Sequence, residues 1–257
     1  MVDGINIQDI VRISKQAGAE ILRIYHDADF SSVVDFKKDD SPLTMADKAA
    51  HEVIAKELLA LDPSIPIISE EGRDIPFEER KDYGHYWLVD PLDGTKEFIK
   101  RNGEFTVNIA LIFQGKPILG VIYTPVTDTT YFGIVEERKA FKQTGENTPV
   151  AITVSNSQSP QIAVRSKSHA APEEEAVLEK YGTTDSISVG SSLKFCMVAE
   201  GKADIYYRHG PTMEWDTGAG QAVVEAAGGK VYEGTGPNPF LYNKESMLNG
   251  SFLCLGF

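Results

Sequence analysis

The sequence predicts a protein of mixed α and β structure, with an antiparallel α+β half followed by a layered α/β half. Apolar residues recur at helical spacing in the first 61 residues, and short apolar runs separated by Gly, Pro or Asp turns follow. From about residue 160, strand patterns alternate with helix patterns. We therefore expect two domains, 1–158 and 159–257, with the favoured ligand site in the cleft between them.

The first half is expected to begin with two amphipathic helices. Residues 6–26 and 45–61 each place apolar side chains at the i, i+3, i+4 spacing of one helix face, and Asp62-Pro63 ends the second helix. The strands expected after them are 65–69, 86–90, 106–113, 118–123 and 130–135. Short turns join the last three strands, which favours antiparallel hairpins.

A polar, turn-rich stretch at 144–160, with one short strand at 150–154, separates the two halves. In the second half, strands are expected at 162–165, 186–189, 204–207, 230–232 and 252–255, and helices at 173–181, 192–200 and 216–227. The last helix begins with small residues that allow close packing. This alternation predicts layers of helices and strands.

The composition excludes several classes of protein. The 257 residues include 25 Lys and Arg against 38 Asp and Glu, a net charge of −13, so a nucleic acid polymer is not an expected partner. The longest apolar run, 109–113, is far shorter than the roughly 20 residues that span a bilayer. Cys196 and Cys254 lie in apolar surroundings and favour free thiols in the cytoplasm. Peripheral attachment to the inner membrane stays open, although no basic amphipathic helix supports it.

The most informative segment is 87–96, where an apolar strand leads into Asp90. Pro91 and Gly94 are expected to form a tight turn before a helical turn near Thr95. Asp90 and Asp93 would then lie together at the end of a strand. The amides of Gly94 and Thr95 would point at the same place from the start of a helix, which suits an anion.

This motif alone has other readings. An Asp before a helix is often only an N-cap. Phosphatases of the haloacid dehalogenase type have two aspartates two residues apart, whereas Asp90 and Asp93 are three apart. A calcium-binding EF-hand needs acids at alternating positions and a Glu at the twelfth. Neither of these two patterns is present, so a cap and a functional site remain the alternatives.

Two further acidic sites strengthen the functional reading. Glu70 and Glu71 end another short strand, and Asp216 begins the small-residue helix, although a solvated loop and a cap would also explain them. Two carboxylates 4 Å apart repel by about 4 kcal/mol at an effective dielectric constant of 20. If these acids converge, their pKa values rise or cations bind. Oxygen ligands without His or Cys favour Mg²⁺, with Mn²⁺ and Ca²⁺ less favoured, over Zn²⁺. Such a cluster beside an anion site is suited to metal-assisted phosphoryl transfer to water.

Three linked motifs resemble, in order and spacing, the signatures of the inositol monophosphatase superfamily: Glu70-Glu71, DPLDGT at 90–95 and WDTGA at 215–219. Members are Mg²⁺-dependent, lithium-sensitive phosphatases. The resemblance spans nearly the whole chain and implies a layered α-β-α-β-α sandwich of the inositol monophosphatase/fructose-1,6-bisphosphatase type. Longer segments, among them 90–112, 190–206 and 210–229, resemble the branch of bacterial 3'(2'),5'-bisphosphate nucleotidases of the CysQ type.

The resemblance implies a role for each matching position. The implied ligands of two or three Mg²⁺ ions are Glu70, Asp90, the carbonyl of Leu92, Asp93 and Asp216. Asp47 and Thr95 would orient and deprotonate the attacking water, with Glu70 as a third catalytic residue, and the amides of Gly94 and Thr95 would hold the scissile phosphate. The positions that match nucleotide contacts are Ser166, His169, Gly190 and Lys194, and Arg208 lies where a second phosphate would bind. Relatives often have Arg where this chain has Lys167, to which no role is assigned.

The residues themselves give partial support. Thr44 and Asp47 have the spacing of a capping box, so a cap alone would explain them. Lys194 lies in the first turn of an apolar helix, where the helix dipole disfavours a cation. A bound anion would resolve that conflict, and a side chain that reaches solvent is the alternative. His169 and Arg208 are otherwise ordinary loop and turn residues. If these cations face the acids, the pocket takes two phosphates.

The resemblance therefore implies a nucleotidase of sulfur metabolism. It would convert adenosine 3',5'-bisphosphate (PAP) to AMP and phosphate and would extend to the sulfated analogue PAPS. The alternatives are an inositol or sugar phosphate phosphatase and a sensor without catalysis, although a sensor would not need both Asp47 and Thr95. The expected partner is a small bisphosphorylated nucleotide, and the oligomeric state is left open between monomer and homodimer.

Overall fold

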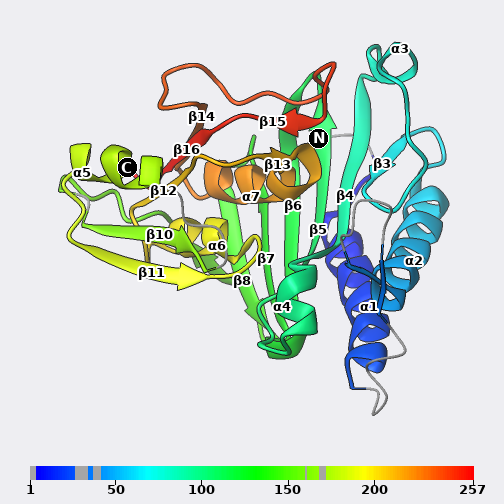
Figure 1. Ribbon diagram of the computed structural model, residues 1–257. Helices are drawn as coiled ribbons and strands as arrows, with labels where there is room; N and C mark the ends of the chain where they lie inside the picture. The colour runs from blue at the N-terminus through cyan, green and yellow to red at the C-terminus, as the bar shows by residue number, and fades with distance from the viewer. Residues whose placement is uncertain (1–3, 27–33, 37–41, 160, 168–171) are drawn as a thin grey trace.

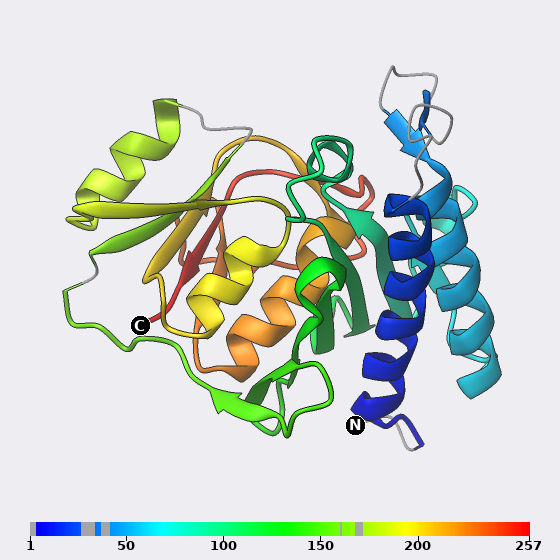
Figure 2. The same ribbon diagram turned by 90° about the horizontal axis from the view of Figure 1, so that it is seen from below.

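The protein is described by a computed structural model that covers residues 4–26, 34–36, 42–159, 161–167 and 172–257, with the backbone alone for 34–36 and 42–44. Its helices and sheets form five layers (Figure 1 and Figure 2). In order, these are α1 with α2, a seven-stranded sheet, α6 with α7, a five-stranded sheet, and α5. The predicted α-β-α-β-α sandwich is thereby confirmed.

The first layer is a pair of helices, α1 (Ile7–Tyr25) and α2 (Met45–Leu61), close to the predicted 6–26 and 45–61. The side chain of Asn6 caps α1 by accepting the N–H of Gln8 at 3.0 Å. Ile10 of α1 and Ile54 of α2 are fully buried in the core against the large sheet. A short antiparallel pair, β1 (Val34–Phe36) and β2 (Pro42–Thr44), precedes α2, so Asp47 falls in the first turn of that helix.

The second layer is a seven-stranded sheet in chain order. Its strands are β3 (Ile67–Ser69), β4 (His85–Asp93), β5 (Thr106–Phe113), β6 (Lys116–Thr124), β7 (Thr129–Ile134), β8 (Lys139–Thr144) and β9 (Val150–Ile152). All neighbours are antiparallel except β3 and β4, which confirms the predicted hairpins. Strand β8 and the short helices α3 (Phe77–Arg80) and η2 (Pro125–Thr127) were not predicted from the sequence. Of α4 (Thr95–Ile99), only a helical turn near Thr95 was predicted.

The remaining layers come from the second half of the chain. The five-stranded sheet has the order β11 (Asp185–Val189), β10 (Ile162–Ser166), β12 (Ile205–Arg208), β16 (Phe252–Leu255) and β14 (Lys230–Glu233). The helices are α5 (Pro172–Lys180), α6 (Leu193–Ala199) and α7 (Glu214–Ala226), and β13 (Thr212–Met213) pairs with β15 (Leu248–Asn249). The sheet is mixed, because β16 is antiparallel to both of its neighbours.

Helix α7 is held tightly between the two sheets. A Cβ atom at Gly220 would lie 2.3 Å from the ring of Phe195 on α6, and one at Gly120 on β6 would lie 2.5 Å from the carbonyl of Ala219. Glycine is therefore required at both positions, because even the methyl group of alanine would not fit between these elements. The same core includes Leu88 of the large sheet and Phe252 of the small one. The packing fixes Asp216 in the first turn of α7. The division into two domains at residue 158 stays a prediction.

Glu214, at the start of α7, is expected to be important for stability. Its fully buried carboxylate accepts the backbone N–H groups of Asn243 and Lys244 at 2.8 and 3.0 Å and the Nζ of Lys244 at 2.6 Å. Glu214→Ala removes the acceptor of the Asn243 and Lys244 N–H groups from a buried position and should lower the free energy of unfolding by about 3 kcal/mol. Urea denaturation measures this loss. Glu179→Ala, on the exposed side of α5, is the control and should change it by less than about 0.5 kcal/mol. A loss as small in Glu214→Ala would contradict the prediction.

Candidate active site

Three acids from distant parts of the chain meet where the large sheet faces α7. Glu70 follows β3, Asp90 lies in β4, and Asp216 lies in the first turn of α7. One carboxylate oxygen of each lies within 4.8 Å of those of the other two. Asp90 is only 1% exposed. The structure therefore brings together three of the acids that the sequence singled out.

Asp93 lies beside this cluster because of an irregularity in β4. The sequence predicted a strand that ends at Asp90, but pairing with β5 continues to Asp93 after a shift in register. Pro91 has no N–H to donate to the ladder, which favours a break at this point. The N–H of Leu92 instead bonds to Oδ1 of Asp90 at 3.1 Å, and Leu92 itself is buried. Besides burial, the charge of Asp93 raises the pKa of both Asp90 and Asp216.

The acids repel one another strongly. Burial raises the pKa of Asp90 well above its usual range, and the charge of Glu70 adds to this effect. Burial also raises the pKa of Asp216 well above its usual range, and that of Asp93 more modestly. Several ionised carboxylates in so small a space require cations. The donor set contains only oxygen atoms, so these residues fit Mg²⁺.

These pKa shifts predict how stability depends on pH. An unfolded Asp loses its proton near pH 3.9, whereas Asp90, Asp93 and Asp216 keep theirs to higher pH in the folded chain. Without divalent ions, the three groups should make the folded state less stable as pH rises from about 4 through the raised pKa values. Mg²⁺ binds the deprotonated form, so it should raise the melting temperature more at pH 8 than at pH 5. Scanning calorimetry measures this shift, and an equal shift at both pH values would contradict the prediction.

Gly94 connects the acids to α4. Its φ of +93° lies in the left-handed region, and a Cβ atom there would lie 3.2 Å from both the carbonyl of Glu104 and the Cβ of Ser191. Glycine is therefore needed on both grounds. Gly94 is the N-cap of α4, and Thr95 is its first residue and lines the pocket, in agreement with the helical turn predicted near Thr95.

Asp47 is 2% exposed, and its charge raises the pKa of Asp90, which places it at the same cluster. The Asp47–Thr95 pair itself stays a prediction.

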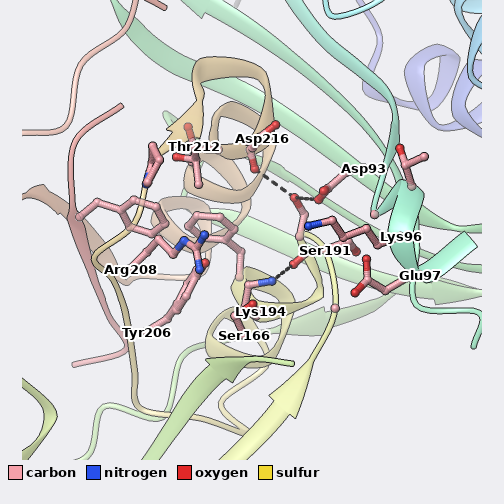
Figure 3. Close-up of a pocket in the computed structure, with 18 of the residues that line it drawn as sticks. Asp93, Lys96, Glu97, Ser166, Ser191, Lys194, Tyr206, Arg208, Thr212 and Asp216 are labelled. Atoms are coloured by element: carbon pink, nitrogen blue, oxygen red, sulfur yellow. Dashed lines mark hydrogen bonds between the residues drawn. The ribbon is translucent and has the colours of Figure 1, made fainter. Parts of the chain in front are cut away.

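A pocket of about 530 Å³ opens beside the acids (Figure 3). Of the residues that the sequence proposed, Glu70, Asp93, Gly94, Thr95, Ser166, Gly190, Lys194, Arg208 and Asp216 line it. Figure 3 shows Lys194 and Arg208 beside Tyr206, with Asp93 and Asp216 nearby. The structure thus combines a basic and an acidic region within one pocket.

Lys194 is buried in the pocket wall, which argues against the alternative of a side chain that extends into solvent. It is 8% exposed, donates to the carbonyl of Ser191 and lies 5.8 Å from the ring centre of Tyr206. Burial lowers the pKa of Lys194, and the charge of Asp93 opposes that shift. A buried cation in a pocket is costly unless an anion accompanies it.

The loop before β5 is joined to the second half of the chain by Glu104. Its two carboxylate oxygens accept the N–H of Gly190 and the Nζ of Lys167, each at 2.9 Å. A Cβ atom at Gly190 would lie 2.9 Å from the carbonyl of Glu104, so glycine allows this approach. Lys167 therefore has a structural partner here, whereas His169 lies outside the described residues.

Several residues of this site were not predicted from the sequence. Ser192 Oγ bonds to Oδ2 of Asp93 at 2.8 Å, and Asn108 Nδ2 bonds to Ser192 at 2.9 Å. Tyr206 of β12 also lines the pocket. One signal was available for Asn108, since it is a single amide within the otherwise apolar strand 106–113. Ser192 and Tyr206 gave no such signal, because the hydrogen bond of Ser192 to Asp93 and the ring contact of Tyr206 with Phe252 join distant segments.

Comparison with known proteins decides the family. The sequence matches the inositol monophosphatase family over residues 7–253, nearly its full length. The chain belongs to the inositol monophosphatase family. It is 47% identical over 249 residues to the 3'(2'),5'-bisphosphate nucleotidase CysQ of Escherichia coli K12, and 46% over 250 residues to that of Salmonella typhimurium. Each alignment covers 96% of this chain and 98% of the relative.

Solved structures of this family agree with the fold. The crystal structure of CysQ from Bacteroides thetaiotaomicron superposes with a TM-score of 0.87 at 42% identity, covering 99% of this chain and 98% of that one. The suhB protein of Bartonella henselae has a TM-score of 0.77 at 25% identity, with coverage of 97% and 93%. Among the described residues, no helix is long and apolar enough to cross a membrane.

Proposed function

We propose that this family member removes the 3'-phosphate of adenosine 3',5'-bisphosphate (PAP), giving AMP and phosphate, in a Mg²⁺-dependent reaction. The observation that carries the proposal is the juxtaposition of Glu70, Asp90 and Asp216 with a pocket that contains the buried Lys194. The relatives named as bisphosphate nucleotidases, at 46–47% identity over almost their whole length, support this substrate. The sulfated analogue PAPS has the same 3'-phosphate and is proposed as a second substrate.

The acidic cluster holds the cations in this proposal. The ligands of two or three Mg²⁺ ions are Glu70, Asp90, the carbonyl of Leu92, Asp93 and Asp216. When bound, divalent ions make a water molecule more acidic and neutralise the charge of the phosphate ester. The chain supplies four carboxylates, of which those of Asp90, Asp93 and Asp216 have raised pKa values before ions bind. A bound cation relieves the repulsion between these carboxylates, which favours its binding.

Other residues of the chain orient the water and the scissile phosphate. Thr95 directs its hydroxyl at the attacking water and passes a proton to Asp47, which is buried beside Asp90. A threonine hydroxyl is a weak base alone, so it needs this carboxylate. The N–H groups of Gly94 and Thr95 donate to the phosphate oxygens. Water then attacks in line with the leaving 3'-oxygen.

The basic part of the pocket recognises the other phosphate. Lys194 and Arg208 bind the 5'-phosphate, while Ser166, Gly190 and His169 contact the nucleoside. Burial lowers the pKa of Lys194 and the charge of Arg208 adds to that shift, and both side chains line the same pocket (Figure 3). A substrate with one phosphate, such as inositol 1-phosphate, would bring no second phosphate to Lys194 and Arg208, which both line the pocket. PAP therefore suits the pocket better than a singly phosphorylated polyol does.

A panel of substrates tests the proposal. Phosphate release is measured from PAP, PAPS and inositol 1-phosphate, each with Mg²⁺, with EDTA, and with Mg²⁺ plus Li⁺. We expect release from PAP that requires Mg²⁺, falls with Li⁺ and exceeds release from inositol 1-phosphate at least about tenfold. Faster release from inositol 1-phosphate would favour the polyol phosphatase instead. No release from any ester would contradict an enzymatic role. The monomeric or dimeric state and the cytoplasmic location stay predictions.

A further inference from the structure

A hydrogen-bonded chain of three polar side chains ends on Asp93. Thr106 Oγ1 donates to Oδ1 of Asn108 at 3.0 Å, and Nδ2 of Asn108 donates to Ser192 Oγ at 2.9 Å. Ser192 Oγ then lies 2.8 Å from Oδ2 of Asp93. Thr106, Asn108 and Ser192 are all at most 2% exposed. This series of hydrogen bonds therefore lies in the interior of the protein, where a fully satisfied network restricts each group to one orientation.

The direction of each bond follows from the donors available. The hydroxyl of Thr106 bonds to the amide oxygen of Asn108, so the NH₂ group of Asn108 faces Ser192. Ser192 has a single proton and two acceptors in reach, Asp93 Oδ2 at 2.8 Å and the carbonyl of Asp216 at 3.1 Å, which dashed lines mark in Figure 3. The shorter bond to a carboxylate is the stronger one, so the proton points at Asp93.

Both side-chain hydrogen bonds that Asp93 accepts within the described residues end on one oxygen. Oδ2 receives Ser192 Oγ at 2.8 Å and, more distantly, Nδ2 of Asn108 at 3.4 Å. Oδ2 is thus held by two side-chain donors, and the backbone N–H of Ser192 also bonds to this carboxylate. Ser192 also touches the backbone of Asp216, so one hydroxyl connects acids from the two halves of the chain.

We propose that Ser192 and Asn108 are a positioning pair that holds Oδ2 of Asp93 and so limits Asp93 to binding a divalent ion through one oxygen. The inference rests on the proposed function, in which Asp93 is a metal ligand. Mg²⁺ requires a small, nearly ideal octahedron, whereas Ca²⁺ accepts more oxygens, two from one carboxylate included, in a flexible arrangement. The pair therefore favours Mg²⁺ over Ca²⁺, which makes it a determinant of ion selectivity.

The test is calorimetric titration of the full-length, ion-free chain with Mg²⁺ and, separately, with Ca²⁺, without substrate. In Ser192→Ala, the dissociation constant for Mg²⁺ should rise about tenfold to a hundredfold, as is usual for residues that orient metal ligands. The constant for Ca²⁺ should change by less than about threefold, because a freed Oδ2 can join in binding the larger ion. The Mg²⁺ to Ca²⁺ preference therefore falls. A general loosening of the fold would instead raise the dissociation constants of Mg²⁺ and Ca²⁺ by the same factor.

Two further variants complete the design. Ser14→Ala removes another fully buried hydroxyl, which donates to the carbonyl of Val11 in α1, and should leave both constants unchanged. Asn108→Ala removes the donor to Ser192 and should shift the preference in the same direction by less. The double variant Ser192→Ala/Asn108→Ala should resemble Ser192→Ala alone, since both act through one oxygen. If Ser192→Ala does not fold, Asn108→Ala carries the test.

The outcomes separate this inference from the function on which it rests. An unchanged chain that binds neither ion would overturn the proposed function and the inference with it. If the unchanged chain binds Mg²⁺ and Ser192→Ala binds it equally well, the inference alone is wrong. Equal losses for Mg²⁺ and Ca²⁺ would also overturn it.

Discussion

Replacing Asp90 by Asn is expected to abolish Mg²⁺-dependent phosphate release while the chain stays folded. Asp90 is the most enclosed acid of the cluster, and its pKa responds to Glu70, Asp93, Asp216 and Asp47 together. Loss of its charge weakens cation binding, and cations are worth several kcal/mol of transition-state stabilisation, so kcat should fall at least about a thousandfold. Steady-state assays with PAP over a range of Mg²⁺ concentrations measure this loss.

The same variant should not destabilise the ion-free protein. Asn keeps the Oδ1 atom that accepts the N–H of Leu92 and removes a charge that its neighbours repel. At pH 8 in EDTA its melting temperature should therefore equal or exceed that of the unchanged chain. Asp82→Asn, in an exposed turn, is the matched control and should change neither activity nor stability. Near-normal turnover in Asp90→Asn would contradict the assignment of the cluster.

Replacing Lys194 by Met should separate the two candidate substrates. Met fills the space of the buried stem but removes the charge that we propose for the 5'-phosphate. Loss of one partner from a buried charge pair costs about 2–5 kcal/mol, so kcat/KM for PAP should fall about a hundredfold. For inositol 1-phosphate, kcat/KM should change by less than about threefold, because this ester has no second phosphate. Parallel assays on both esters measure the difference.

The design must account for the proximity of Lys194 to Asp93, since each affects the pKa of the other. Both assays are therefore run at saturating Mg²⁺, so that weaker ion binding does not contribute. Lys180→Met, at the exposed end of α5, is the control for loss of a positive charge. Equal losses on PAP and inositol 1-phosphate would remove the basis for a second-phosphate pocket at Lys194.

Much of the fold could be predicted because the patterns that specify its helices and hairpins lie within short segments of the sequence. The helices 7–25 and 45–61 follow from apolar periodicity, and the hairpins between 106 and 134 follow from short turns. Strand β8 was not predicted because its residues alternate weakly and are mostly polar, with only Ala140 buried. The order of the five-stranded sheet, with β16 inserted between β12 and β14, depends on pairing of segments far apart in the sequence. No local pattern specifies such pairing.

The candidate site divides in the same way. Asp90, Asp93 and Gly94 form one short motif, so chemistry could be assigned to them from the sequence. Their convergence with Glu70 and Asp216 was an expectation that only coordinates could examine. The strand through Asp93 was wrongly ended at Asp90, because a Pro and a Gly close together suggest a turn as readily as an irregular strand. The contact of Ser192 with Asp93 joins segments that no pattern relates.

The meeting of Glu70 and Asp90 with Asp216 has a consequence for how the chain folds. The first two acids come from neighbouring strands of the large sheet, whereas Asp216 arrives with α7, which needs both sheets for its packing. A folding intermediate in which only the large sheet has formed would lack Asp216 as a ligand of the cation. Recovery of ion affinity after dilution from urea should therefore lag behind recovery of strand structure, and so report the docking of α7 as the late kinetic event.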